Sequence, residues 1–212
     1  MGHKPATIRI PTVSQCLSLM DEHGMLDNIR AHSLMVARVA DTLYHGLDTA
    51  RSGRIQPPEH GLVLAGALLH DIAKTPCLGN TCDHARQGRD ICAALGYPEV
   101  GEIVREHVIL RDFSPERYGR GQFQAKEIVY YADKRVCHDE IVPLHQRLDY
   151  IVDRYARNDH ERQELIRANF QRCVILEGYL FAGLDFQPED LKKQIKTTLR
   201  THASPRHVPS KI

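Results

Sequence analysis

The chain has 212 residues and a formal net charge of +1, with 28 lysines and arginines against 27 aspartates and glutamates. A chain of that length can bury a sizeable core. Its acidic and basic residues are interspersed, so there is no block of like charge that would indicate binding to a nucleic-acid polymer or a membrane surface. No apolar stretch is long enough to span a bilayer and the first ten residues lack a signal-peptide apolar region, so we expect a cytoplasmic protein.

Apolar residues recur at helical spacing and no stretch alternates as a strand would, so the predicted fold class is all-α. Loops containing glycine or proline separate the helices, and Asp27 or Asn28 can cap the second one. The expected helices cover residues 11–23, 27–46, 59–74, 83–95, 98–110, 125–137, 141–155, 160–181 and 188–199. We expect one domain over residues 1–202, with its core at about 25–137, a helical extension at about 139–200 and a disordered tail at 203–212.

The third of these helices is apolar along most of its length but ends in three polar, ionisable residues. Between Leu62 and Leu69 it has no charged side chain, which predicts a helix buried on most sides, and its last turn then holds His70, Asp71 and Lys74. Burying such groups is costly unless something neutralises them, and a metal ion commonly does so for His next to Asp. The alternative is a helix end frayed into water.

Five expected helices place metal-capable residues on their inward faces. Besides His70 and Asp71, these residues are His32, His84, His107 and Asp133. One inward histidine is usually an ordinary core residue, but five helices in a row favour a shared site. Nitrogen ligands with two carboxylates suit Fe, Mn, Co, Ni or Zn better than Ca, and Mg stays a further possibility. Six ligands with a bridging Asp71 leave room for one or two ions.

The order of these residues resembles a known family. His32, then His70-Asp71 in Leu-Leu-His-Asp-Ile-Ala-Lys, then Asp133 in Tyr-Ala-Asp-Lys is similar to the HD-domain metal-dependent phosphohydrolases. His84 and the later His107 resemble the extra histidines of dinuclear members, such as small bacterial diadenosine-tetraphosphate hydrolases. The cyclic-di-GMP phosphodiesterases are more distant, because this chain has Ala85 and a single histidine at His107 where they have Pro and a His pair.

The resemblance implies an HD-type helical bundle with added C-terminal helices and assigns roles to the residues. His32, His70, Asp71 and Asp133 would hold one divalent transition metal, with Fe or Mn favoured. His84 and His107, bridged by Asp71, would hold a second metal. Asp71 would also be catalytic. From their positions in the sequence rather than from the resemblance, we expect Lys74 to be catalytic too, and Lys74, Arg111 and Lys134 to contact the phosphate of a small nucleotide-type substrate. Lys74, Arg111 and Lys134 have an alternative interpretation in which they do not bind phosphate. Arg111 and Lys134 would then be ordinary solvated charges, and Lys74 would interact favourably with the helix dipole.

Three functions remain open at this point. The leading hypothesis is a phosphohydrolase that uses a metal-activated water on a phosphate ester or anhydride. The second is a non-catalytic HD module that senses a nucleotide, and the third is an interaction protein with a structural metal. The helices after Cys137 either cover the pocket or form a homodimer face.

Other residues with metal-binding chemistry are expected to lie outside this site. Most of the six cysteines read as small apolar residues, whereas Cys77 and Cys82 could form a zinc half-site or a disulfide across a loop. Among the remaining histidines, His45 is expected to be exposed, and His60 begins the helix of His70 too far away to share its metal. His138, His145 and His160 lie in polar contexts.

Overall fold

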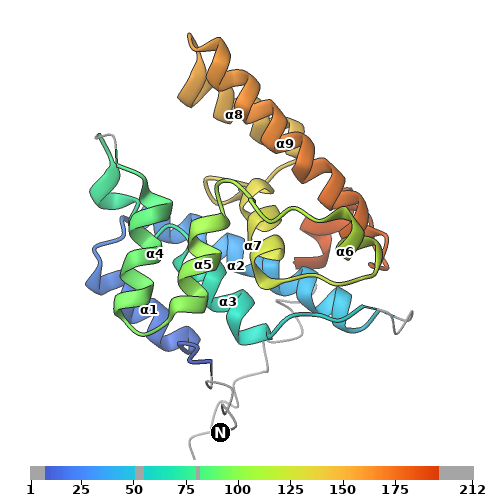
Figure 1. Ribbon diagram of the computed structural model, residues 1–212, viewed down its shortest axis with the longest axis horizontal. Helices are drawn as coiled ribbons and strands as arrows, with labels where there is room; N and C mark the ends of the chain where they lie inside the picture. The colour runs from blue at the N-terminus through green and yellow to red at the C-terminus, as the bar shows by residue number, and fades with distance from the viewer. Residues whose placement is uncertain (1–7, 51–54, 80–81, 196–212) are drawn as a thin grey trace, which may run out of the picture.

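The computed structural model describes residues 8–50, 55–79 and 82–195, and the fold over this part of the chain is helical, as predicted (Figure 1). The helices of more than one turn are α1 (Val13–Glu22), α2 (Asp27–Asp48), α3 (His60–Leu69), α4 (His84–Ala94), α5 (Pro98–Glu106), α6 (Pro115–Gly119), α7 (Ala125–Lys134), α8 (Leu144–Ala156) and α9 (His160–Phe181). Short 3-10 turns lie at Thr75–Cys77 and Pro188–Asp190. The expected tail at 203–212 lies outside the described residues.

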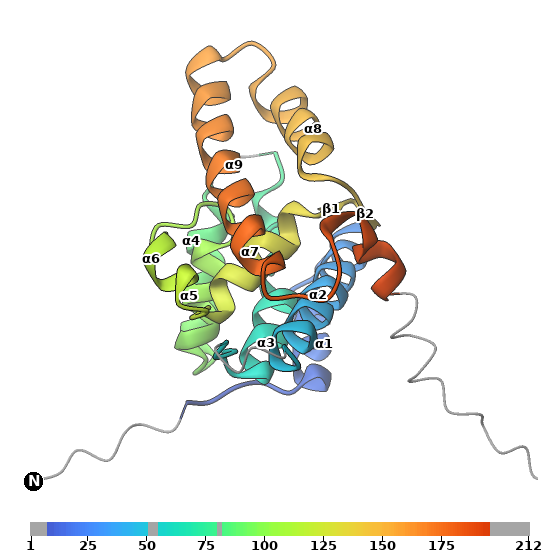
Figure 2. The same ribbon diagram turned by 90° about the vertical axis from the view of Figure 1, so that its right-hand side faces the viewer.

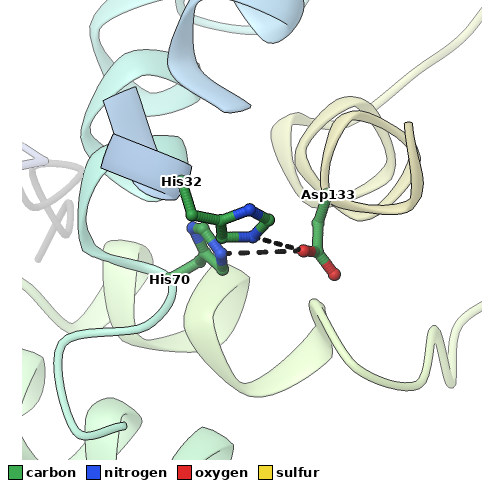
Figure 3. Close-up of side chains that lie close together, drawn as sticks. All are labelled: His32, His70 and Asp133. Atoms are coloured by element: carbon green, nitrogen blue, oxygen red, sulfur yellow. Dashed lines mark hydrogen bonds and ion pairs between the residues drawn. The ribbon is translucent and has the colours of Figure 1, made fainter. Parts of the chain in front are cut away.

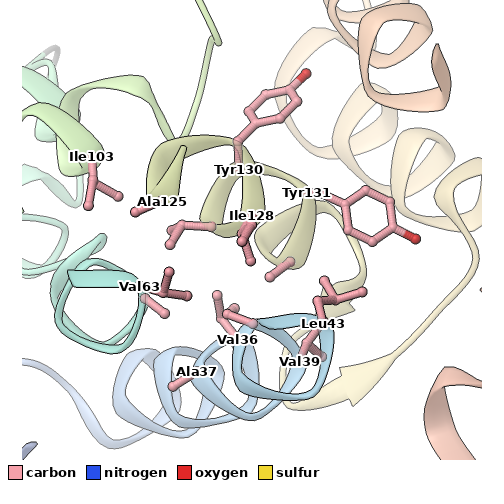
Figure 4. Packing of buried hydrophobic residues seen from close by; sticks show 14 of the residues in the cluster. Val36, Ala37, Val39, Leu43, Val63, Ile103, Ala125, Ile128, Tyr130 and Tyr131 are labelled. Carbon is pink, nitrogen blue, oxygen red and sulfur yellow. The ribbon is translucent and has the colours of Figure 1, made fainter. Parts of the chain in front are cut away.

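The core lies where α2, α3, α5 and α7 meet. Helix α2 packs on α3 and α7, and α5 closes the other side against α3 and α4. Figure 4 shows the facing surfaces, with Val36 and Leu43 of α2 directed toward Ile128 of α7. All three side chains are fully buried. This packing fixes α2, α3 and α7 relative to one another, and these are the elements that carry His32, His70 and Asp133.

A close helix approach near the site depends on a glycine. A Cβ built on Gly66 of α3 would lie 2.6 Å from Cγ2 of Ile103 on α5, which is closer than two carbon atoms can pack. The absence of a side chain at Gly66 therefore lets α3 lie against α5. This places the end of α3 beside the end of α5, where His107 follows the helix.

Helices α8 and α9 form a hairpin that projects from the rest of the fold (Figures 1 and 2). The apolar faces of these two helices are only partly buried. Phe170, Cys173 and Leu176 are buried against the core, but Tyr155, Leu165 and Val174 are exposed. These three side chains stay exposed because the outer part of the hairpin has no layer packed over it among the described residues.

Several predicted boundaries differ from the structure. Leu26, not Asp27 or Asn28, is the N-cap residue of α2, which continues past Gly46 to Asp48. A Cβ on Gly46 would overlap Cδ2 of Leu184, so the glycine within α2 makes room for that side chain. The expected helix over 59–74 ends at Leu69, and residues 70–74 continue as turns. Of the expected helix over 188–199, residues 188–190 form a 3-10 turn, residues 191–195 are α-helical, and 196–199 lie outside the described part.

Two short elements were not predicted. Ser114 caps α6 within the expected loop over 111–122, and its Tyr118 is buried. After α7, strands β1 (Val136–Cys137) and β2 (Glu140–Ile141) form an antiparallel hairpin, so that the expected helix over 125–137 stops at Lys134. The hairpin turn contains His138 in the left-handed region, with φ of 57°. The carbonyl of this residue contributes to the site described below.

The cysteines follow the prediction in part. Cys16, Cys92 and Cys173 are buried as apolar residues, and Cys77 and Cys82 form a disulfide that closes the loop before α4. The zinc half-site at these two cysteines is therefore not what the structure shows. Among the described residues, no helix is both long and apolar enough to cross a membrane.

Candidate metal centre

Three elements far apart in sequence bring His32, His70 and Asp133 together (Figure 3). The Nε2 atom of His32 lies 3.0 Å from Oδ1 of Asp133, and Nε2 of His70 lies 3.8 Å from the same oxygen. All three residues are at least nine-tenths buried. The first predicted ligand group thus forms one compact cluster, to which Asp71 adds Oδ2 at 3.4 Å from Nε2 of His70.

A second cluster lies on the other side of the Asp71 carboxylate. Nε2 of His84 and Nε2 of His107 are each 3.5 Å from Oδ1 of Asp71, and they are 3.3 Å from one another. His84 is the first residue of α4 and is held there because Asp83 caps the helix. His107 directly follows α5 and is buried. Asp71 therefore presents one oxygen to each cluster.

Backbone carbonyls orient three of these imidazole rings. Nδ1 of His32 lies 2.7 Å from the carbonyl of His138, Nδ1 of His70 lies 2.8 Å from that of Ala67, and Nδ1 of His107 lies 2.5 Å from that of Val104. A carbonyl only accepts hydrogen bonds, so each Nδ1 carries a proton and directs its Nε2 atom toward the carboxylates, where Nε2 would bind a metal ion. This is the arrangement in which metal-ligating histidines are usually held.

The two carboxylates are ionised despite their burial. Burial raises the pKa of Asp71, but the Lys74 ammonium, 2.7 Å from Oδ2, and the nearby His70 hold that pKa well below its ordinary value. Burial likewise raises the pKa of Asp133, and the ammonium of Lys134 and the hydrogen bond with His32 outweigh it. Both groups therefore carry the negative charge that a cation needs.

The histidines of the second cluster are uncharged near neutral pH. Burial lowers the pKa of His84 to about 4, with a further contribution from the neighbouring His107. Burial also lowers the pKa of His107. For His70 the effect of burial is opposed by Asp71, and the pKa of its imidazole is raised. Neutral His84 and His107 have a free lone pair for a metal ion.

Two buried atoms of the centre have no hydrogen-bond partner among the described residues, namely Nε2 of His70 and Oδ1 of Asp71. Leaving a buried polar atom without a partner costs about 1–3 kcal/mol. A divalent cation between the clusters would satisfy both atoms, and nitrogen with carboxylate oxygen is a donor set that suits Fe, Mn, Co, Ni or Zn. The residues present thus fit the metal predicted from the sequence.

The three predicted phosphate contacts differ in their surroundings. Lys74 lies at the edge of the centre and is partly exposed. Lys134 is buried. Its ammonium donates to the carbonyl of His107 at 2.7 Å and pairs with Asp133 at 2.8 Å, so it links these two residues of the centre. Arg111 is exposed, 3.7 Å from Glu106. A role for these cations in substrate binding stays a prediction.

The structure adds Arg147, which the sequence analysis did not identify. This residue of α8 is buried, its Nη2 lies 3.9 Å from Oδ1 of Asp133, and its Nε has no hydrogen-bond partner among the described residues. The guanidinium also lies over the ring of Tyr150. In the sequence, Arg147 is simply an arginine four residues after Pro143 in an ordinary amphipathic helix, and nothing there indicates a role at the metal centre. The helical extension therefore contributes a cation to the centre.

A hollow of about 280 Å³ is lined by residues that flank His84 and His107 in sequence, although none of the six predicted ligands lines it. Its walls include the immediate neighbours of two ligands, Asp83 and Ala85 beside His84 and Val108 beside His107. Four arginines line it, namely Arg86, Arg89, Arg105 and Arg111. Arg89 is paired with Asp90 and Arg111 with Glu106, whereas Arg86 and Arg105 have no carboxylate partner in the described part of the chain.

The side chains of His45, His60, His145 and His160 lie outside the metal centre. His145 and His160 are exposed on α8 and α9. His45 is exposed and His60 is half-buried, and they gather around Asp41 at the opposite ends of α2 and α3 from the centre. His138 reaches the centre through its backbone carbonyl, a contribution that no side-chain pattern could reveal.

Comparison with known proteins finds two relatives that align over part of their length, and one protein family whose model matches the chain. Two proteins named tRNA (cytidine(56)-2'-O)-methyltransferase are similar to this chain: that of Picrophilus torridus is 29% identical over 164 residues, and that of Thermoplasma volcanium is 28% identical over 162 residues. The alignments cover 70% and 72% of this chain but 43% of each relative, so the chain spans less than half of their length. No solved structure matches the chain significantly. The family model described as HD domain matches residues 29–136, the segment that contains all six predicted metal ligands, and the chain belongs to this family.

Proposed function

We propose that this chain is a divalent-metal-dependent phosphohydrolase that acts on a nucleotide-type phosphate ester or anhydride. The HD domain is typical of metal-dependent hydrolases, and the finer assignment rests on one observation. Asp71 lies between two clusters of imidazole nitrogens. Its Oδ1 atom and Nε2 of His70 are buried without hydrogen-bond partners among the described residues. A purely structural metal site would be closed by four ligands, whereas this set exceeds that number.

The residues would divide the work as follows. His32, His70, Asp71 and Asp133 would hold one ion, and Asp71, His84 and His107 would hold the other. When bound, two such ions supply Lewis acidity, which polarises phosphate oxygens and activates a water molecule for attack on phosphorus. The chain's own contribution is to fix these ligands in position and to exclude bulk water from the buried side of the centre.

Cations of the chain would bind the phosphate. The Lys74 ammonium and the Arg147 guanidinium lie on the Asp71 and Asp133 sides of the centre. Both can donate to phosphate oxygens and offset the charge that gathers on them during hydrolysis. Arg86 and Arg105, without carboxylate partners in the described structure, would bind a further anionic group of the substrate in the hollow that they line. This favours a substrate with more than one phosphate.

Two observations support a second candidate. The relatives carry a name that refers to tRNA, and the hollow of about 280 Å³ is lined by arginines. An HD module that binds a nucleotide or an RNA phosphate without turnover would use the same surface. It differs from the first candidate in one measurable respect, since it forms no product with any metal.

The test is a metal-reconstituted activity screen. Protein freed of metal with a chelator would be loaded with Fe²⁺, Mn²⁺, Co²⁺, Ni²⁺, Zn²⁺ or Mg²⁺ and incubated with a phosphomonoester, a phosphodiester and a dinucleoside polyphosphate. We expect phosphate or nucleotide release that depends on the metal and disappears in Asp71→Asn. Tight nucleotide or tRNA binding with no product in any metal would instead establish the second candidate.

A further inference from the structure

We infer that Asp41, His45 and His60 form a separate zinc site, which joins the end of α2 to the start of α3. Nε2 of His60 lies 2.7 Å from Oδ1 of Asp41, and Nε2 of His45 lies 3.4 Å from the same oxygen. One potential ligand atom from each residue falls within 4.8 Å of the others. Donor atoms of a tetrahedral zinc ion with bonds of about 2.1 Å lie roughly 3.4 Å apart, so small shifts would suffice.

The local sequence explains why these groups meet. Asp41 and His45 are four residues apart on α2 and therefore share one helix face. His60 begins α3, which packs against α2. The ring of Tyr44 stacks on that of His60, with centroids 4.3 Å apart and planes at 20°, and contacts His45 edge-on. This aromatic packing holds the His60 imidazole in an orientation in which Nε2 faces the carboxylate.

The chemistry of the group favours zinc over a hard cation. Two imidazoles and one carboxylate match the three-ligand sets of zinc sites, whereas Ca²⁺ and Mg²⁺ prefer oxygen ligands. The side chains are 27% (Asp41), 51% (His45) and 34% (His60) exposed, so an ion can enter from solvent and keep water as its fourth ligand. The alternative is that Asp41 accepts ordinary hydrogen bonds from the two rings.

This site is distinct from the HD centre. Nine residues separate His32 from Asp41 on α2, and ten residues separate His60 from His70, which at 1.5 Å per residue corresponds to roughly 14–15 Å. The two helices would thus be tied together at both ends. Zinc at the second site would stabilise the helix pair that carries His32 and His70, without contributing a group to the reaction.

The experiment is a zinc titration of the chelator-treated 212-residue chain in competition with a chromophoric chelator. It compares the wild type with His45→Ala, His60→Ala, His60→Cys and the exposed control His145→Ala. We expect His45→Ala and His60→Ala each to lose one zinc equivalent or to weaken it at least about tenfold, while His60→Cys and His145→Ala retain it. Mg²⁺ should not compete. Hydrolytic activity should persist in His45→Ala, since that residue is not in the HD centre.

Two results would overturn the inference. Zinc stoichiometry and affinity unchanged in both alanine variants would show that Asp41, His45 and His60 bind no ion. Equal loss of zinc in the His145→Ala control would show adventitious surface binding. Thermal unfolding gives a second readout, because zinc should raise the Tm of the wild type more than that of His45→Ala.

Discussion

Arg147 offers a sharp test of how the centre binds phosphate. Its Nη2 is 3.9 Å from Asp133 and its Nε has no partner among the described residues, so the guanidinium has donors to offer to a substrate. Hydrogen bonds to charged groups contribute about 1.5–3 kcal/mol. Loss of one such bond in the transition state corresponds to a roughly 10- to 150-fold decrease in kcat/KM for Arg147→Ala.

The metal centre itself should survive this substitution, because Asp133 keeps its contacts with Lys134 and His32. The assay is steady-state hydrolysis of a phosphomonoester and a phosphodiester, together with metal content. Arg147→Lys should recover part of the activity, since it keeps the charge but loses the planar fork. Arg154→Ala, an exposed change on the same helix, is the control. A kcat/KM of Arg147→Ala within twofold of wild type, at equal metal content, would refute the role.

Three further predictions concern the centre and its scaffold. Asp71→Asn should lose bound metal and turnover together, because the amide keeps the size but not the charge; full metal with full activity, by elemental analysis and product assay, would contradict the bridging role. His138→Val should lower the Tm by a few degrees, since a left-handed backbone costs a residue with a Cβ about 1–2 kcal/mol and a β-branched residue more, whereas His138→Gly should not. Gly66→Ala should destabilise the fold by about 1–3 kcal/mol in urea unfolding because its Cβ would meet Ile103, while Gly178→Ala, with open space around it, should be neutral or stabilising.

The inward placement of the site residues could be predicted from the sequence because helical periodicity determines which residues share a face. His32 and His107 lie among apolar residues at three- and four-residue spacing, and both are buried in the structure. The apolar run before His70 likewise predicted the burial of α3. The all-α fold class followed from the same periodicity and is confirmed.

Features that depend on tertiary contacts were not predictable in this way. The carbonyl of His138 orients His32 through a two-strand hairpin too short to leave an alternating pattern. Arg147 looks like any polar residue of an amphipathic helix until the fold brings its guanidinium to within 3.9 Å of Asp133. The exposure of Leu165 and Val174 was not predictable either, since periodicity shows that a helix has an apolar face but not whether anything covers it.

The most direct test of the account is metal content by elemental analysis of protein purified without chelators or a metal-binding tag, on the wild type and on variants of each cluster. To remove the separate zinc site from the count, each protein would carry His45→Ala. We expect about two equivalents of Fe, Mn or a similar metal, of which one is lost in His84→Ala or His107→Ala. About one equivalent, unaffected by either change, would contradict the dinuclear centre, and no metal even after reconstitution would contradict the central claim.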